Sequence, residues 1–517
     1  MSQSLLSFDT DRIKSYVFAS DLLREIRGAS NLLDELNREK LPQLVLGDRA
    51  GEPGKTWYSA GGSGLFVVET AEVEEMIHRV QQAYAEQTGG AATITGVAVE
   101  LPPVFQVQTD DIRPFWKLLG YRLKAAKTRN RDYQASVSHP LFRPGETDGS
   151  CYATDEDDEG QPISRASLLK SNRNRRLRDD REKRGKPLPE DFAEIARASI
   201  PQNYFALMVA DGDSLGQTLE QCETLPEIVA FSRCMHQTLT EVVKQAAQNL
   251  AIQSRHHDVL LQAGDDLVVA LPAHQALAFA KQVAEQFTAQ MQQAARQDDT
   301  LPRFLADCPP TLSTAVVWSH VKFPFGAWRS IAESALAFTK QQRAARLQAN
   351  PRATEPLINF LVVSSANHLE FKDYYNSVLV WKHETCYEQI VRTMRPYTVS
   401  GLQRLVACRQ KTLRNIPRSK LEALRQAVFQ PTYQQAMLDA LRVLVHWRSE
   451  TGKQAVQNLV SSSMEEMGAS GNMLFPFIKT EAPDEFDEDE MMQTYRTPLA
   501  DLAELWDFLP GGGEDAE

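Results

Sequence analysis

Two adjacent carboxylates occupy a short turn between two apolar segments of the chain. The turn spans residues 262–266 and ends with Asp265 and Asp266, and the flanking segments 259–261 and 267–271 are typical of the two strands of a β-hairpin. Two carboxylates beside buried strands are costly unless a cation neutralises them. The turn therefore predicts a binding site for a divalent cation, and Mg²⁺ is the first candidate.

A second acidic cluster lies upstream, at the end of another apolar segment. Residues 204–210 are apolar and are followed by Asp211, Gly212 and Asp213. Carboxylates at the end of one strand and in a neighbouring hairpin supply oxygen ligands for Mg²⁺ or Mn²⁺ without enclosing the ion, and the phosphates of a nucleotide complete the shell. Such an open site can hold two ions that promote an in-line displacement at phosphorus.

The same pattern occurs earlier in the chain. Residues 5–11 are an apolar segment that contains Asp9 and Asp11, spaced as Asp211 and Asp213 are, and a glycine-rich turn at 61–64 follows. Asp9 is 54 residues before Ser63, as Asp211 is 54 residues before Asp265. One fold is therefore expected to occur twice.

Each copy also has helical segments and a last strand in corresponding places. Helices are predicted at 72–86 and 273–293, and the returning strands at 92–99 and 312–318. The order strand, helix, hairpin, helix, strand predicts an α+β fold with two tandem ferredoxin-like palm domains.

The copies differ at the turn, where we expect Ser63 and Gly64 in place of the two carboxylates. A first palm without them is not expected to hold two metal ions. Backbone N–H groups of Gly61, Gly62 and Ser63 can still bind a nucleotide phosphate, because glycine permits close approach to the main chain.

Composition places few limits on the rest of the chain. Its 517 residues suggest three or four domains, and 68 acidic against 56 basic residues give a net charge of −12, which argues against a general nucleic-acid coat but not against a local basic groove. Six dispersed cysteines without a C-x-x-C pair favour a reducing, cytoplasmic compartment. No signal peptide and no apolar segment of about 18 residues is recognisable, so no membrane partner is expected.

The predicted domains are a first palm at 1–105, an inter-palm insert at 106–200, a second palm at 201–370, a helical C-terminal domain at 371–480 and an acidic, partly disordered tail at 481–517. Residues 155–160 are expected to form an exposed loop, and 356–363 an edge strand of the second palm. The insert carries two basic groups: Arg122, Lys124, Lys127, Arg129 and Arg131, and then Arg173, Arg175, Arg176, Arg178, Arg181, Lys183 and Arg184. These groups either contact phosphates or form solvated helix faces paired with nearby acids.

Taken together, the chain resembles the large polymerase/cyclase subunit of type III CRISPR–Cas effector complexes. The resemblance rests on the two palms, the Asp211 and Asp265 clusters, a cysteine-bearing insert and the helical C-terminal region, and residues 24–34 and 319–324 add to it. It implies a subunit for antiviral defence that joins ATP into cyclic oligoadenylate messengers when target RNA is bound. The implied partners are other effector subunits, guide RNA, target RNA and ATP.

The resemblance also implies roles for individual residues. Asp211, Asp265 and Asp266 would be the catalytic, metal-binding carboxylates. The implied nucleotide-binding set in the second palm is Gly212, Asp213, Ser214, Gly264 and Lys340. Gly212 and Gly264 would let the backbone approach the nucleotide, Asp213 is a further candidate ligand, and Lys340 is either a triphosphate contact or a surface lysine that ends a helix.

Three departures from the family pattern affect what the resemblance implies. Ala263 stands where the family has a glycine, which would cost roughly 1 kcal/mol if this position requires a positive φ. The first palm begins at once, so we expect no N-terminal His-Asp nuclease domain and no cleavage of single-stranded DNA. Cys151 alone cannot form the four-cysteine site of the family's insert, so the insert is predicted to be a degenerate zinc ribbon without zinc.

Two other functions remain open: a catalytically silent, architectural subunit that binds guide RNA and partner subunits, and a free-standing defence nucleotide cyclase. A P-loop NTPase is not favoured, because the chain has no G-x-x-x-x-G-K-[ST] motif. A diguanylate cyclase is not favoured either, since its signature continues with Glu and Phe where this chain has Asp266 and Leu267.

Overall fold

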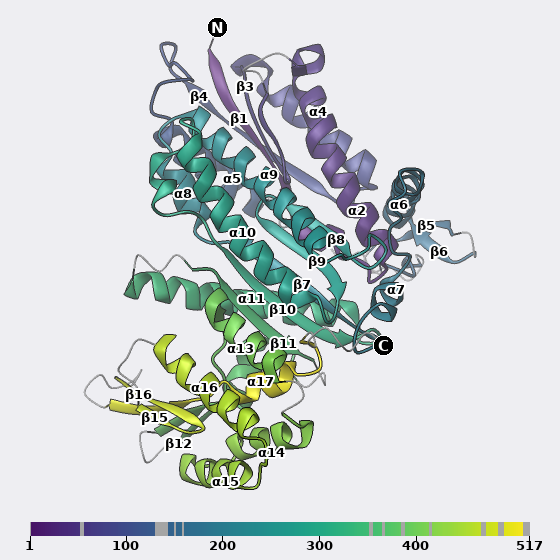
Figure 1. Ribbon diagram of the computed structural model, residues 1–517. Coiled ribbons are helices and arrows are strands. Elements are labelled where there is room, and N and C mark those ends of the chain that lie inside the picture. The colour runs from purple at the N-terminus through teal and green to yellow at the C-terminus, as the bar shows by residue number, and fades with distance from the viewer. Residues whose placement is uncertain are drawn as a thin grey trace.

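The computed structural model contains the two palms, the insert between them and a C-terminal region, arranged along one long axis. Figure 1 shows the first palm at the top, the second palm in the middle and the C-terminal region at the bottom. The structure describes residues 2–51, 56–129, 143–148, 151–157, 160–350, 355–363, 368–383, 388–412, 416–466, 472–483 and 491–509.

The first palm is a four-stranded antiparallel sheet in the order β2-β3-β1-β4. Its elements are β1 (Gln3–Asp11), α1 (Ile13–Val17), α2 (Leu23–Glu35), α3 (Leu41–Leu46), β2 (Thr56–Ala60), β3 (Ser63–Glu69), α4 (Val73–Thr88) and β4 (Thr93–Leu101). This strand order is that of a ferredoxin-like fold, which confirms the prediction for this copy.

The second palm repeats the arrangement and extends it. Its elements are β7 (Tyr204–Gly212), α8 (Leu215–Gln221), α9 (Leu225–Asn249), β8 (Asp258–Ala263), β9 (Asp266–Pro272), α10 (Ala276–Gln297), β10 (Leu312–His320), α11 (Phe325–Ala349) and β11 (Leu357–Val362). The sheet order is β14-β11-β10-β7-β9-β8. The prediction of an edge strand at 356–363 is wrong, because the short β14 (Tyr397–Thr398) pairs with the outer side of β11.

The side chains of β7 alternate between two cores on opposite faces of the second sheet. Those of Ala206 and Met208 pack in the same cluster as α9 and α10, whereas those of Phe205 and Leu207 pack with α2, α7 (Phe192–Arg197) and α11. This alternation is the ordinary geometry of a strand buried on both faces. The first palm's α2 is thereby fixed against the sheet of the second palm, beside β8.

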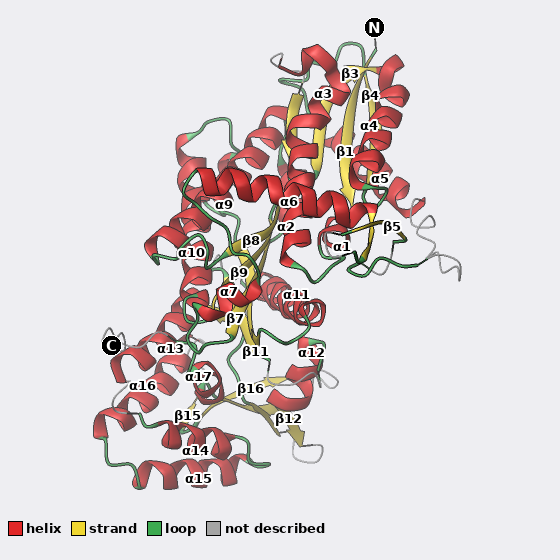
Figure 2. Ribbon diagram, turned by 90° about the vertical axis from the view of Figure 1, so that its right-hand side faces the viewer, coloured by secondary structure: helices red, strands yellow, loops and turns green. Residues whose placement is uncertain are grey.

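The insert contributes α5 (Arg113–Arg129), β5 (Ala153–Glu156), β6 (Pro162–Ser164) and α6 (Arg165–Lys183). Helix α6 packs closely along α2: a Cβ at Gly28 would lie 1.9 Å from the carbonyl oxygen of Lys170. Figure 2 shows this helix crossing the palms. The start of the predicted loop at 155–160 belongs to the strand β5, and residues 158 and 159 lie outside the described residues.

Several basic residues of the insert make contacts within the protein. Arg173 forms an ion pair with Glu35, with an N–O distance of 2.6 Å, and Lys127 forms one with Asp9 at 2.5 Å. Arg122 donates to the carbonyl of Ala98. The predictions of phosphate contact and of pairing with nearby acids are therefore both incomplete. These three residues instead contact the first palm. Arg131 lies outside the described residues.

The C-terminal region contains a five-stranded sheet in addition to helices. The helices are α12 (Phe371–Tyr374), α13 (Val399–Thr412), α14 (Arg418–Val428), α15 (Tyr433–Val445), α16 (Glu450–Glu466) and α17 (Leu499–Leu505), and the strands are β12 (Val380–His383), β13 (Glu388–Val391), β15 (Asn472–Leu474), β16 (Phe477–Pro483) and β17 (Met491–Arg496). The sheet order is β12-β13-β17-β16-β15. The prediction of a helical domain is therefore incomplete, because short strands separated by helices show no local pairing signal.

The predicted acidic tail contributes to the folded core. Strand β17 pairs with β13 and β16, and Leu499, Leu502 and Leu505 of α17 are buried. The predicted disorder at the extreme C-terminus concerns residues 510–517, which lie outside the described residues. In the described part of the chain, no helix is both long and apolar enough to cross a bilayer.

Candidate active site

The carboxylate hairpin is a two-residue turn between β8 and β9. Ala263 is the last residue of β8 and pairs with Asp266, the first of β9, and Gly264 has a φ of +65°. Glycine is the residue best suited to this turn position. Ala263 is not among the residues with positive φ, so the cost that we expected for alanine does not arise.

The hairpin brings Asp265 next to Asp211, at the end of β7. A Cβ added to Gly212 would lie 2.3 Å from the Leu215 side chain and 3.1 Å from the Cβ of Asp265, so glycine favours this close approach. Burial raises the pKa of Asp265 to about 7, and a hydrogen bond with the Asp211 carboxyl group adds to the shift. Burial also raises the pKa of Asp266. Burial is the largest cause of both pKa shifts, and the negative charge of the neighbouring carboxylates adds to them. Negative charge concentrated in one place attracts a cation.

Two lysines neutralise part of this charge. Lys340, on α11, has its Nζ 2.6 Å from Asp211 Oδ2 and 3.1 Å from the carbonyl oxygen of Gly212. Lys14, on α1 of the first palm, has its Nζ 2.7 Å from Asp266 Oδ1. Lys340 was predicted as a site residue. Lys14 was not, because no pattern in the sequence connects two residues so far apart.

Asp213 lies apart from the other carboxylates. Its two side-chain oxygens accept hydrogen bonds of 2.6 Å from Thr311 and Ser313, and Arg343 lies 3.8 Å away. Both partners in this ion pair are buried, and burial raises the pKa of Asp213. Asp213 therefore anchors the end of β7 to β10, and its predicted role as a ligand is not supported. The neighbouring Ser214 is exposed and has a left-handed backbone at the start of α8.

The first palm repeats this charge arrangement without the turn carboxylates. Lys127 pairs with Asp9 as Lys340 does with Asp211. Asp11 accepts hydrogen bonds from Thr93 and Thr95, the counterparts of the bonds to Asp213. A lysine partner for the strand-end aspartate is thus common to both palms.

The strand register corrects the alignment of the two turns. Asp9 pairs with Ser63, whereas the pairing of Ala210 with Leu267 puts Asp211 next to Asp266. Ser63 therefore corresponds to Asp266, not to Asp265 as the equal spacing had predicted. The connection before the hairpin is one residue longer in the second palm.

The two turns lie against each other. A Cβ at Gly61 would be 2.4 Å from the backbone nitrogen of Gly264, and one at Gly62 would be 2.3 Å from the Ile13 side chain. Gly61 and Gly62 also have positive φ values, of 62° and 88°. These glycines thus have a packing role between and within the palms. Their binding of a nucleotide, with Ser63, stays a prediction.

Gly61→Ala is expected to destabilise the protein by about 2–4 kcal/mol, since it combines a strained backbone with overpacking against Gly264. Urea unfolding measures this loss. Gly90→Ala is the matched control: Gly90 also has a positive φ, of 80°, but a Cβ there would have nothing within 4 Å, so only about 1 kcal/mol is expected. Equal losses of unfolding free energy in the two variants would show that the two turns do not pack against each other.

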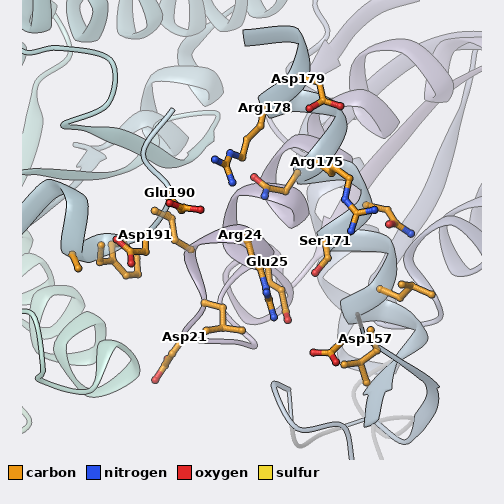
Figure 3. A pocket seen from close by; sticks show the side chains of 18 of the residues that line it. Asp21, Arg24, Glu25, Asp157, Ser171, Arg175, Arg178, Asp179, Glu190 and Asp191 are labelled. Carbon is orange, nitrogen blue, oxygen red and sulfur yellow. The ribbon is translucent and has the colours of Figure 1, made fainter. Parts of the chain in front are cut away.

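The three carboxylates lie outside the two cavities described next. A cavity of about 900 Å³ lies between α2, α6 and the segment before α7. Figure 3 shows Arg175 and Ser171 on one side of it and Glu190 and Asp191 on the other. Another, of about 640 Å³, lies between α2, α6, α9 and β8. None of the three carboxylates lines either cavity.

The carboxylates do not form a complete metal cage on their own. Among the described residues, no group of three or more His, Cys, Asp or Glu side chains is placed so that it could hold a metal ion. One or two carboxylates suffice for Mg²⁺ when phosphates and waters supply the remaining ligands. The donor set, which is all carboxylate oxygen, fits a hard divalent cation.

Comparison with known proteins identifies the type of palm. Residues 204–347 match the protein family described as Cas10/Cmr2, second palm domain. The second palm is thus similar to the second palm of Cas10/Cmr2 proteins. This match spans the residues that carry Asp211, Asp265, Asp266 and Lys340. No curated protein sequence matches the chain.

Solved structures extend the likeness beyond the second palm. A Csm1–Csm4 cassette in complex with cA4 superposes with a TM-score of 0.52 at 13% identity, covering 89% of this chain and 67% of that one. Csm1 of T. onnurineus gives 0.50 at 14% identity, with the same coverage. A Csm1–Csm4 subcomplex of the type III-A CRISPR-Csm interference complex matches at 14% identity and a TM-score of 0.45, and this chain covers 53% of its length.

At such identities the matches establish the fold alone, and the chain covers only about half to two thirds of the proteins that it matches. The resemblance drawn from the sequence is therefore confirmed at the level of a Cas10-like palm protein. The predicted absence of a nuclease domain and of zinc stays a prediction.

Proposed function

We propose that this protein is the nucleotidyltransferase subunit of a type III CRISPR effector and joins ATP into cyclic oligoadenylate-type messengers. The observation that carries the proposal is the convergence of Asp211 and the Asp265–Asp266 hairpin beside Lys340, within the segment that matches the Cas10/Cmr2 palm. Structures related in fold include a Csm1–Csm4 cassette in complex with cA4, a ligand of the proposed product class.

The residues of the site suit each part of this reaction. Asp211, Asp265 and Asp266 would hold Mg²⁺ or Mn²⁺. A bound divalent cation would favour ionisation of the attacking ribose hydroxyl and stabilise the charge on the α-phosphate as pyrophosphate leaves. Lys340 lies at the carboxylates, where it can donate to a phosphate oxygen once Asp211 has another partner. A Cβ at Gly264 would have nothing within 4 Å, so this glycine leaves space beside the hairpin turn.

The proposed partners follow from the same comparison. Csm1 occurs with Csm4 in the related structures, so we propose that this chain assembles with a subunit of that kind and with guide RNA and target RNA. The basic residues of the insert that do not contact the first palm are candidates for the RNA contacts.

The test is conversion of ATP by the full-length protein with Mg²⁺ or Mn²⁺, alone and with partner subunits, guide RNA and target RNA. Products are separated by chromatography and identified by mass. We expect cyclic or linear adenylates, and pyrophosphate, in at least the complete assembly. If ATP raises the melting temperature but no product forms in any combination, the protein is a silent architectural subunit. Product formation without RNA or partners would instead indicate a free-standing cyclase.

A further inference from the structure

Lys14 is a residue of the first palm that contacts a carboxylate of the second. It lies on α1, just after β1, and its ammonium group is 2.7 Å from Asp266 Oδ1. About a third of each side chain is exposed, at 36% for Lys14 and 32% for Asp266. The contact is therefore reachable by solvent and by ligands, unlike the buried pair of Arg27 and Asp258 that also joins the two palms.

The two lysines at the site pair with two of the three carboxylates. Lys340 pairs with Asp211 and Lys14 with Asp266, and Asp265 has no cationic partner among the described residues. Each ammonium group lies within 2.7 Å of one oxygen of its carboxylate, so its positive charge would oppose a divalent cation at the same carboxylate. Binding of a cation by Asp266 must therefore compete with Lys14.

Displacement does not remove Lys14 from the site. Its flexible four-carbon stem carries three donors, and α1 fixes its Cα beside the hairpin. Glu333 and Asp211 also lie close enough to attract its charge. A nucleoside triphosphate bound at the carboxylates would put several phosphate charges within reach of the same ammonium group. Phosphate oxygens accept strong, charge-assisted hydrogen bonds from an ammonium group.

We propose that Lys14 belongs to the nucleotide site of the second palm: it neutralises Asp266 when the site is empty and binds the triphosphate when nucleotide is present. The inference rests on the proposed function, since it needs a triphosphate at these carboxylates. It makes the first palm a contributor to the active site of the second. The two palms must then keep their contact for the site to be complete.

If the Lys14–Asp266 ion pair had only a structural role, the expected results would differ. A partly exposed ion pair contributes little to stability, commonly under about 1 kcal/mol. If Lys14 only joined the palms, its loss would lower stability slightly and would change the binding of metal and nucleotide together or not at all. A counter-ion that changes partners must instead affect the two ligands in opposite directions.

The experiment compares the full-length wild type with Lys14→Met, which keeps the length of the side chain and removes its charge. Mn²⁺ affinity without nucleotide is measured by electron paramagnetic resonance. Affinity for a non-hydrolysable ATP analogue at saturating Mn²⁺ is measured by calorimetry. We expect Mn²⁺ to bind about two- to five-fold more tightly, because a competing cation is gone. The analogue should bind about ten-fold more weakly, because a charged hydrogen bond to phosphate is lost.

Two further variants control for charge and shape. Lys244→Met removes an exposed lysine of the second palm, on α9, one that pairs with Glu241, and should change neither affinity. Lys14→Arg keeps the charge and should recover most of the nucleotide affinity. Affinities that move together in Lys14→Met, or that stay unchanged, overturn the role of Lys14 while the proposed function stands. A wild type that binds neither Mn²⁺ nor the analogue overturns both.

Discussion

Replacing both hairpin carboxylates, Asp265→Asn with Asp266→Asn, is expected to lower the rate of ATP conversion at least about 1,000-fold, which corresponds to roughly 4 kcal/mol of transition-state stabilisation. The two amides fill the same space but cannot replace the negative charge that holds a divalent cation. The rate is measured as pyrophosphate released in the assembly that supports turnover. Nucleotide binding should weaken as well, because the triphosphate binds as its metal complex.

The matched control is Asp299→Asn with Asp307→Asn. This control changes the net charge by the same amount as the hairpin variant, at two exposed positions of the second palm. It should leave the rate within about two-fold of the wild type. A hairpin variant that retains a tenth or more of the wild-type rate would show that these carboxylates are not catalytic.

Measuring the stability of the hairpin variants shows whether a loss of activity comes from a loss of fold. Because burial raises the pKa of Asp265 to about 7, the folded state binds a proton that the unfolded state has lost, and the metal-free wild type loses stability as the pH rises from about 4 to about 7. The single variant Asp265→Asn has no such loss. It should therefore be at least as stable as the wild type above pH 7.

The second large effect is expected in the C-terminal region, for Asp501→Ala. Asp501 and Arg395 are fully buried, with Arg395 Nε 3.0 Å from Asp501 Oδ1, and Asp501 also accepts hydrogen bonds from Thr393 and Tyr397. Removing the carboxylate leaves a buried guanidinium whose remaining acidic partner among the described residues is Glu504. We expect a loss of about 3–5 kcal/mol, measured by urea unfolding.

An exposed ion pair of the same region is the control for this prediction. Asp507 pairs with Arg418, and about half of each side chain is exposed. Asp507→Ala should cost under about 1 kcal/mol. Similar losses in the two variants would mean that burial does not set the strength of the Arg395 pair.

The palms were predictable because their signals are local. Alternating apolar strands, a glycine turn and an intervening helix repeat at nearly equal spacing, and the carboxylates lie at ends of strands that the fold must bring together. The one-residue error in aligning Ser63 arose because equal spacing along the chain does not fix strand register. Pairing depends on the connection between the strands, which is longer by one residue in the second palm.

The remaining features depend on contacts between distant residues. Lys14 reaches Asp266 across 252 positions, and Asp501 reaches Arg395 from a segment whose acidic composition suggested a tail. Strands as short as β13 and β15 have no periodic pattern that is long enough to recognise. Ala263 was overinterpreted for a related reason: the family pattern gave a residue type, whereas the backbone at that position is extended.

The most direct test is a crystal structure of the protein with Mn²⁺ and a non-hydrolysable ATP analogue, recorded with anomalous diffraction. We predict Mn²⁺ about 2.0–2.3 Å from carboxylate oxygens of Asp211 and of Asp265 or Asp266, with the triphosphate on the same ion. The ammonium groups of Lys14 and Lys340 should have turned from the carboxylates to phosphate oxygens. Nucleotide bound elsewhere, with both lysines still paired to Asp266 and Asp211, would contradict the account.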